Sequence, residues 1–180
     1  MALKVFLVGI AAALVTSVSA ADQQFVDWTV GVNTAKTWSY AATVNDSGSI
    51  LGEYCAFKTG KCFWTILLDF ECEGSAAYPI LGNTPSGAVP LQIKCDGKTD
   101  QGAYRYVFIN WKDLEGLLKD SHEVGFAVPM KSELFKVVRF SLTGRTDAMN
   151  LAEGIAVNQN AGNQGQDKSE TRKPTSNTTL

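Results

Sequence analysis

The fold is decided by residues 55–95, which read CAFKTGKCFWTILLDFECEGSAAYPILGNTPSGAVPLQIKC. This stretch holds all four cysteines of the chain: Cys55, Cys62, Cys72 and Cys95. Between them run segments rich in aromatic and β-branched residues, which are typical of strands, and clusters such as NTPSG, which are typical of turns. We therefore expect residues 55–95 to build the disulfide-stapled centre of a small β domain.

The N-terminus carries the three parts of a secretory signal peptide. Lys4 supplies the positive charge, residues 5–15 are apolar, and residues 18–20 (VSA) fit a cleavage site before Ala21. The apolar run is shorter than the roughly 20 residues that a membrane-spanning helix needs. We expect residues 1–20 to be removed and the mature protein to be periplasmic or secreted, with no membrane span after cleavage.

Four cysteines in an exported chain predict two disulfides. Three pairings are possible, and we favour Cys55–Cys62 with Cys72–Cys95, because the first closes a short turn-forming loop and the second joins two expected strands. The chain-entropy model gives these loops about 2.5 and about 3.5 kcal/mol of stabilisation. A zinc site is a poor alternative, because no C-x2-C pair occurs and the only histidine, His122, lies far along the chain.

Alternation of apolar and polar residues predicts about eight short strands separated by turn signals. Pro79 places its strand at a sheet edge or delays its start. The pattern predicts an all-β fold, a β-sandwich or barrel-like domain over residues 21–157 with one or two short helices. The clearest expected strands are residues 25–32, 38–44, 62–70, 78–82, 89–95, 104–111, 124–128 and 135–142.

Helical spacing occurs at two places. Leu114, Leu117 and Leu118 predict a short helix with Asn110 as its N-cap, and residues 147–156 predict a second helix. From residue 158 to 180 the chain is almost entirely polar. Such a segment buries too little apolar surface to offset its ordering entropy, so we expect a disordered tail there.

Composition and missing motifs exclude several classes of function. The net charge is −2, and no basic patch with interleaved aromatic residues suggests nucleic-acid binding. Nucleophile-elbow, H-E-x-x-H and dinucleotide-binding motifs are absent. His122 lies beside Ser121 and Glu123, but catalytic groups normally converge from separate segments. We expect no cofactor and no catalytic residue.

One acidic row offers an alternative. Asp69, Glu71 and Glu73 alternate at the end of an expected strand, near Trp64. Carboxylates on one face can share calcium, and a pair of them can hydrolyse a glycoside. The alternative function is therefore a carbohydrate- or calcium-binding domain or a hydrolase that uses this row, although no calcium-loop pattern accompanies it and a solvated strand end explains it more simply.

The order of features resembles the invasion-associated locus B family of exported bacterial proteins. The resemblance rests on D-W-T-V at residues 27–30 and on V-R-F-S-L-T-G at residues 138–144, followed by Asp147-Ala148-Met149. Where compared family members carry a cysteine after the first strand, this chain has Gly31-Val32. The resemblance implies an exported all-β domain linked to host association or envelope biology, without catalytic residues to transfer.

These observations favour an exported, non-catalytic bacterial protein that acts through contacts with an unknown protein partner. A purely structural envelope component, tethered by the tail, is a further reading. The sequence does not specify the oligomeric state.

Overall fold

The computed structural model describes residues 22–130 and 134–170, and in this part ten strands form one antiparallel sheet. The expected signal peptide, residues 1–20, lies outside the described residues. The strands are β1 (Gln23–Phe25), β2 (Trp28–Val32), β3 (Trp38–Val44), β4 (Ile50–Ala56), β5 (Cys62–Leu68), β6 (Ala77–Thr84), β7 (Gly87–Lys98), β8 (Tyr104–Phe108), β9 (Glu123–Pro129) and β10 (Phe135–Ser141). The helices are α1 (Trp111–Leu118) and α2 (Arg145–Glu170).

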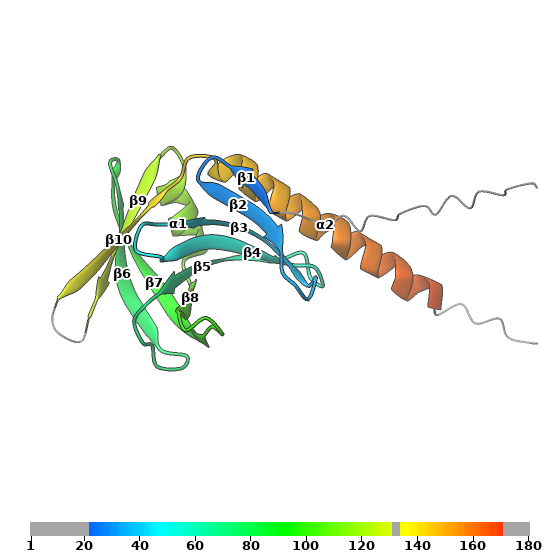
Figure 1. The fold of residues 1–180 in the computed structure, drawn as a ribbon, viewed down its shortest axis with the longest axis horizontal. Helices are drawn as coiled ribbons and strands as arrows, with labels where there is room; N and C mark the ends of the chain where they lie inside the picture. Colours follow the sequence, from blue (N-terminus) through cyan, green and yellow to red (C-terminus); the bar gives the residue numbers. More distant parts are fainter. Residues whose placement is uncertain (1–21, 131–133, 171–180) are drawn as a thin grey trace, which may run out of the picture.

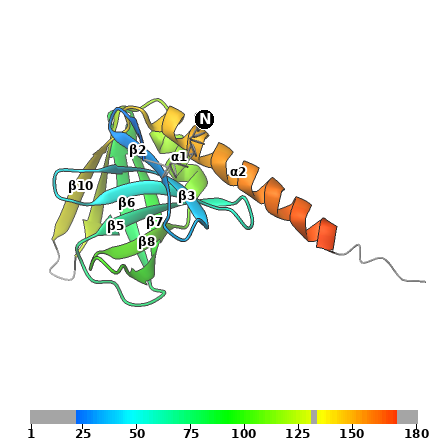
Figure 2. The same cartoon turned by 45° about the vertical axis from the view of Figure 1, so that its right-hand side comes forward.

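The strands lie in the order β1-β2-β3-β4-β5-β8-β7-β6-β9-β10. The sheet curls, so that β2–β5 run across the steeper strands β6, β7, β9 and β10 (Figures 1 and 2). Its concave face encloses the core, in which the rings of Trp28 and Trp64 meet edge to face at 6.1 Å. The expected all-β fold class is confirmed.

The outer face of β3, β4 and β5 carries an aromatic row rather than a second layer of strands. Tyr40 packs beside Tyr54, Tyr54 stacks on Phe63, and Trp38 meets Phe63 edge to face at 5.3 Å. The opposite face of β3 presents Ser39 and the other small residues to α2. The strand therefore buries its small side chains and leaves its aromatic side chains half-buried outside.

Both favoured disulfides are present. Cys55 and Cys62 face each other on neighbouring strands β4 and β5, with Cα atoms 4.0 Å apart. Cys72 lies in the loop after β5 and is bonded to Cys95 on β7. The cysteines are thus structural and offer no free thiol among the described residues.

Both expectations for the strand that holds Pro79 are wrong, and β6 does not start late, because it begins at Ala77, before the proline. This strand lies inside the sheet, between β7 and β9, so it is not an edge strand. Its pairing with β9 covers only Leu81 to Asn83, which leaves Pro79 beyond the ladder on that side. The missing N–H of proline therefore removes no pairing with β9.

Helix α1 buries Leu114, Leu117 and Leu118, as expected. The expected capping role of Asn110 is wrong. Asn110 occupies the N-cap position, but its side chain makes no capping hydrogen bond. Its φ of −92° and ψ of 56° lie outside the β region from which N-cap side chains reach the first turn.

Helix α2 corrects the expected boundary of the polar tail. The helix continues to Glu170, so residues 158–170 are helical, whereas residues 171–180 lie outside the described residues. The Ser39 hydroxyl donates to the Ala152 carbonyl at 2.6 Å, and the Asn160 amide donates to the carbonyls of Phe57 and Lys58. The Asn160 contacts anchor part of the segment whose composition alone predicted disorder, whereas the Ser39 contact lies in the helix that the spacing predicted.

No described helix is both long enough and apolar enough to cross a membrane.

Candidate functional site

The two segments that carried the family resemblance meet at a seam in the curled sheet. The Trp28 indole N–H donates to the Ser141 carbonyl at 3.0 Å, and the Ser141 hydroxyl donates to Asp27 Oδ2 at 2.6 Å. The Asp27 N–H also donates to the Thr143 carbonyl. These bonds join the start of β2 to the end of β10 and close the seam at this end.

Gly144 permits this closure. Its φ is +89°, in the left-handed region that favours glycine. A Cβ atom here would lie 2.0 Å from the carbonyl oxygen of Phe25. The chain therefore needs glycine where the last strand passes β1 and enters α2.

Beyond the closure, β10 is an edge strand whose backbone groups can be assigned by register. The Leu142 N–H donates to the His122 carbonyl, and the Met130 N–H donates to the Leu134 carbonyl. Each of these residue pairs continues the β9–β10 ladder by one step beyond one of its ends. Antiparallel pairs alternate between hydrogen-bonded and non-hydrogen-bonded. The even-numbered residues of β10 therefore bond β9, whereas the N–H and C=O groups of Phe135, Val137 and Arg139 point to the open side.

Side-chain exposure follows the same alternation. Val138 and Phe140 are buried in the core, while Phe135 is 69% exposed and Val137 is 49% exposed. In Figure 1 the β9–β10 hairpin extends away from the helices, with β10 at the border of the sheet. The edge thus combines free backbone groups with apolar side chains in solvent.

A cleft of about 660 Å³ runs along this edge. One wall is β10 from Val137 to Ser141, and the other is the β3–β4 turn from Thr43 to Ser47. Gln24, Val26 and Asp27 line its closed end. The cleft is therefore the open part of the seam.

Carboxylates outnumber cations in this cleft. Asp27, Asp46 and Glu123 line it together with one cation, Arg139. Arg139 Nε lies 3.8 Å from Glu123 Oε1, and both side chains are largely exposed. The lining therefore carries net negative charge.

The expected acidic row is not a row on a strand. β5 ends at Leu68, so Asp69, Glu71 and Glu73 lie in the following loop. Asp69 accepts a bond from Lys136, and this contact lowers the pKa of the Asp69 carboxyl. Trp64 is only 1% exposed, so its ring is not available to stack on a sugar. The structure does not unite the row with Trp64 at one surface.

His122 lies in the exposed turn between α1 and β9. A shallow cleft there is also lined by Asp120, Ser121 and Asp147. The backbone carbonyl of His122 accepts a hydrogen bond from the Leu142 N–H, so the His122 backbone extends the pairing between β9 and β10. Ser121 and Glu123 are its chain neighbours, and the described residues that line this cleft from a distant segment include Arg145, Thr146 and Asp147.

Glu53 is a buried carboxyl that sequence reasoning missed. It is 4% exposed, on the concave face of β4, and its Oε2 has no hydrogen-bond partner. Burial and the neighbouring carboxylates of Glu153 and Glu115 raise its pKa to about 8, while Arg145 acts in the opposite direction. The alternation of β4 places Glu53 between inward-facing Leu51 and Cys55, which was the signal available in the sequence.

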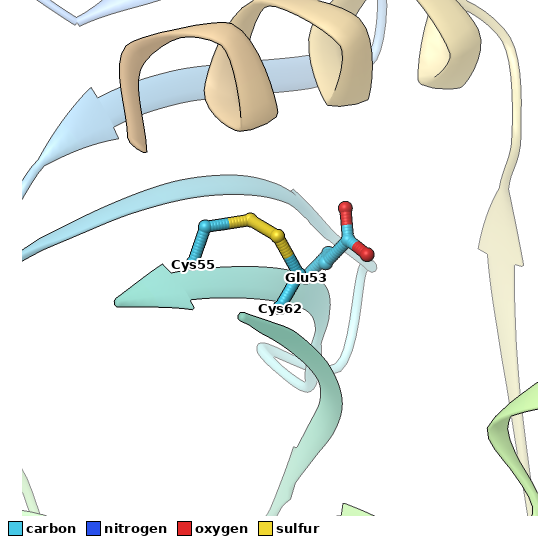
Figure 3. Close-up of side chains that lie close together, drawn as sticks. All are labelled: Glu53, Cys55 and Cys62. Atoms are coloured by element: carbon cyan, nitrogen blue, oxygen red, sulfur yellow. A yellow bond between two sulfur atoms is a disulfide. The ribbon is translucent and has the colours of Figure 1, made fainter. Parts of the chain in front are cut away.

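Glu53 does not form a metal site with its neighbours. It lies beside Cys55 and Cys62, the one group of three ligand-type side chains close enough to share an ion in the described part of the chain. Both sulfur atoms belong to a disulfide, and the Glu53 carboxyl turns away from that bond (Figure 3). Disulfide sulfur is not the thiolate that metals bind.

Comparison with known proteins supports the fold alone. No protein-family model and no curated protein matches the chain. Among solved structures, the chain is similar to the crystal structure of invasion associated protein B from Bartonella henselae, with a TM-score of 0.53 and 13% sequence identity. The match covers 76% of this chain and 98% of that chain. The likeness agrees with the family resemblance at the level of the fold.

Proposed function

We propose that this chain is an exported, non-catalytic protein that acts through contact with another protein, in host association or envelope biology. The observation that carries the proposal is an exposed apolar patch on the outer face of β6, β9 and β10. We call it the hairpin patch, and its large members are Leu81, Phe135 and Val137.

The sheet register makes these side chains neighbours. Leu81 pairs with Ala127, which pairs with Val137, and Phe135 pairs with Pro129 at the hairpin end. A contiguous exposed apolar patch on a protein surface commonly marks an interaction site. The hairpin patch therefore supports a protein partner more directly than the dispersed acidic side chains support catalysis.

Export is supported by the two disulfides, because such bonds form and persist in oxidising compartments. The structural neighbour is described as invasion associated, which agrees with a role in host association. A catalytic reading would need a cleft in which acid, base or nucleophile converge.

The proposal is tested by cross-linking the full-length chain in cells that naturally produce it. We expect a cross-linked species of defined mass that Leu81→Ser with Phe135→Ser removes. The matched control is Ile109→Ser with Val157→Ser, which replaces two exposed apolar side chains outside the hairpin patch. Equal cross-linking in both variants, no cross-linked species in the wild type, or retention of the chain with its leader in the cytoplasm would contradict the proposal.

A further inference from the structure

The open edge of β10 is built to accept a strand. Phe135, Val137 and Arg139 each direct one N–H and one C=O away from β9, and no proline interrupts β10. Exposed edges of this kind pair readily with another extended segment, and natural sheets usually block them with charges, prolines or bulges. Arg139 is the one charged side chain on the solvent face of this edge.

The surrounding cleft selects a single segment over a whole domain. An added strand would lie about 4.8 Å from β10. The β3–β4 turn faces β10 from the far side of the cleft, where the second strand of an incoming sheet would have to lie. If a second copy of this domain paired its β10 with this edge, the β9 strand of that copy would collide with the β3–β4 turn. An isolated extended segment has no second strand and would not collide.

The walls specify the chemistry of this segment. Side chains opposite Val138 would point inward to Thr43, and those opposite Val137 would lie on the outer face, where Val44 and Val137 are exposed. At the closed end, Asp27 and Glu123 flank Ser141. This end is suited to a basic residue.

We infer that β10 binds an extended segment of a partner polypeptide as an eleventh strand, with β-branched residues along Phe135 to Arg139 and a Lys or Arg at the Asp27 end. This inference rests on the proposed function and adds the mode of contact to it. The backbone of β10 supplies the hydrogen bonds, Val44 and Val137 contact apolar side chains on the outer face, and the carboxylates set the charge preference. Such strand addition is a known mode of peptide recognition.

The test uses the ¹⁵N-labelled full chain and capped synthetic peptides that alternate Val and Thr, with Lys at the first or the last position. At a peptide concentration of about ten times Kd, we expect amide exchange at Val137 and Arg139 to slow about tenfold. Lys136, Val138 and Phe140, which already bond β9, should change little. A peptide with every backbone amide methylated cannot donate to β10 and should not bind.

Val137→Pro removes the central free N–H without touching the β9 ladder, and Val137→Thr is the matched control that keeps it. The proline variant should lose peptide binding and the threonine variant should retain it. Asp27→Asn with Glu123→Gln should weaken binding of the Lys peptides but not of their Gln analogues. Unaltered exchange at Val137 with every peptide, equal binding by Val137→Pro, or binding of the methylated peptide would overturn the inference.

The two proposals fail in different ways. If the cross-linked species depends on the hairpin patch but persists in Val137→Pro, the proposed function stands and strand addition fails. If the peptides bind as described but no cross-linked species forms in cells, strand addition stands and the proposed cellular role fails.

Discussion

Glu53 makes stability depend on pH through a single residue. The folded state holds its pKa at about 8, against 4.5 in the unfolded chain. Between these values the folded protein keeps a proton that the unfolded chain has released, so the free energy of unfolding falls as pH rises from 4.5 to 8 and levels above it. The difference sets an upper bound of about 5 kcal/mol, which solvent access to the carboxyl reduces.

We predict that Glu53→Gln removes much of this dependence, because glutamine keeps the shape but does not ionise. Urea unfolding at pH 5 and pH 8.5 measures the change in stability for each protein. Glu71→Gln, in the exposed loop, is the control and should follow the wild type. A wild-type protein that gains stability across this range, or a Glu53→Gln protein that loses as much as the wild type, would refute the assigned pKa.

Two glycines are predicted to respond in opposite directions to alanine. Gly144→Ala should lower the free energy of unfolding by about 2 kcal/mol or more, because the left-handed φ and the Phe25 carbonyl both oppose a Cβ. Gly116→Ala should raise it by about 0.5–1 kcal/mol, because Gly116 lies within α1 and its Cβ would meet nothing within 4 Å. Thermal and urea unfolding test both, and stabilisation by Gly144→Ala would contradict the close passage of β1.

At the scale of elements, each disulfide has a separate task. Cys55–Cys62 crosslinks the β4–β5 hairpin. The two residues are seven positions apart in the sequence and are already paired directly opposite each other on the two strands. Cys72–Cys95 fixes the loop after β5 to β7 across 23 positions. The second crosslink constrains the unfolded chain more.

Replacing Cys72 and Cys95 by Ala should therefore destabilise the protein more than replacing Cys55 and Cys62. The chain-entropy model predicts about 3.5 against about 2.5 kcal/mol. Urea unfolding of the two double variants measures the difference. The reverse order would show that strain or packing, rather than loop entropy, governs these crosslinks.

Local patterns were sufficient to predict most elements. The apolar alternation predicted the strand over residues 89–95 and the leucine spacing predicted α1, because burial on one face follows the period of the element. The faces of β3 could not be assigned this way. Its aromatic residues lie outside because α2, more than 100 residues later in the chain, packs on Ser39 and Ala41.

At the scale of the whole molecule, the candidate site exists because the curled sheet brings the start of β2 against the end of β10. Asp27 and Ser141 are 114 positions apart, and only the curl of ten strands brings them together. The sequence marked both segments through the family resemblance but gave no register between them. The open edge, the cleft and the hairpin patch follow from that closure and could not be predicted from local spacing.

The open edge of β10 is tested most directly by native-state amide hydrogen exchange on the full-length chain in the absence of any partner. We expect an alternating pattern, with slow exchange at Lys136, Val138 and Phe140, which bond β9, and fast exchange at Val137 and Arg139, which face the cleft. Equal protection at all five amides would show that this edge is already paired and would contradict an open site for a partner strand.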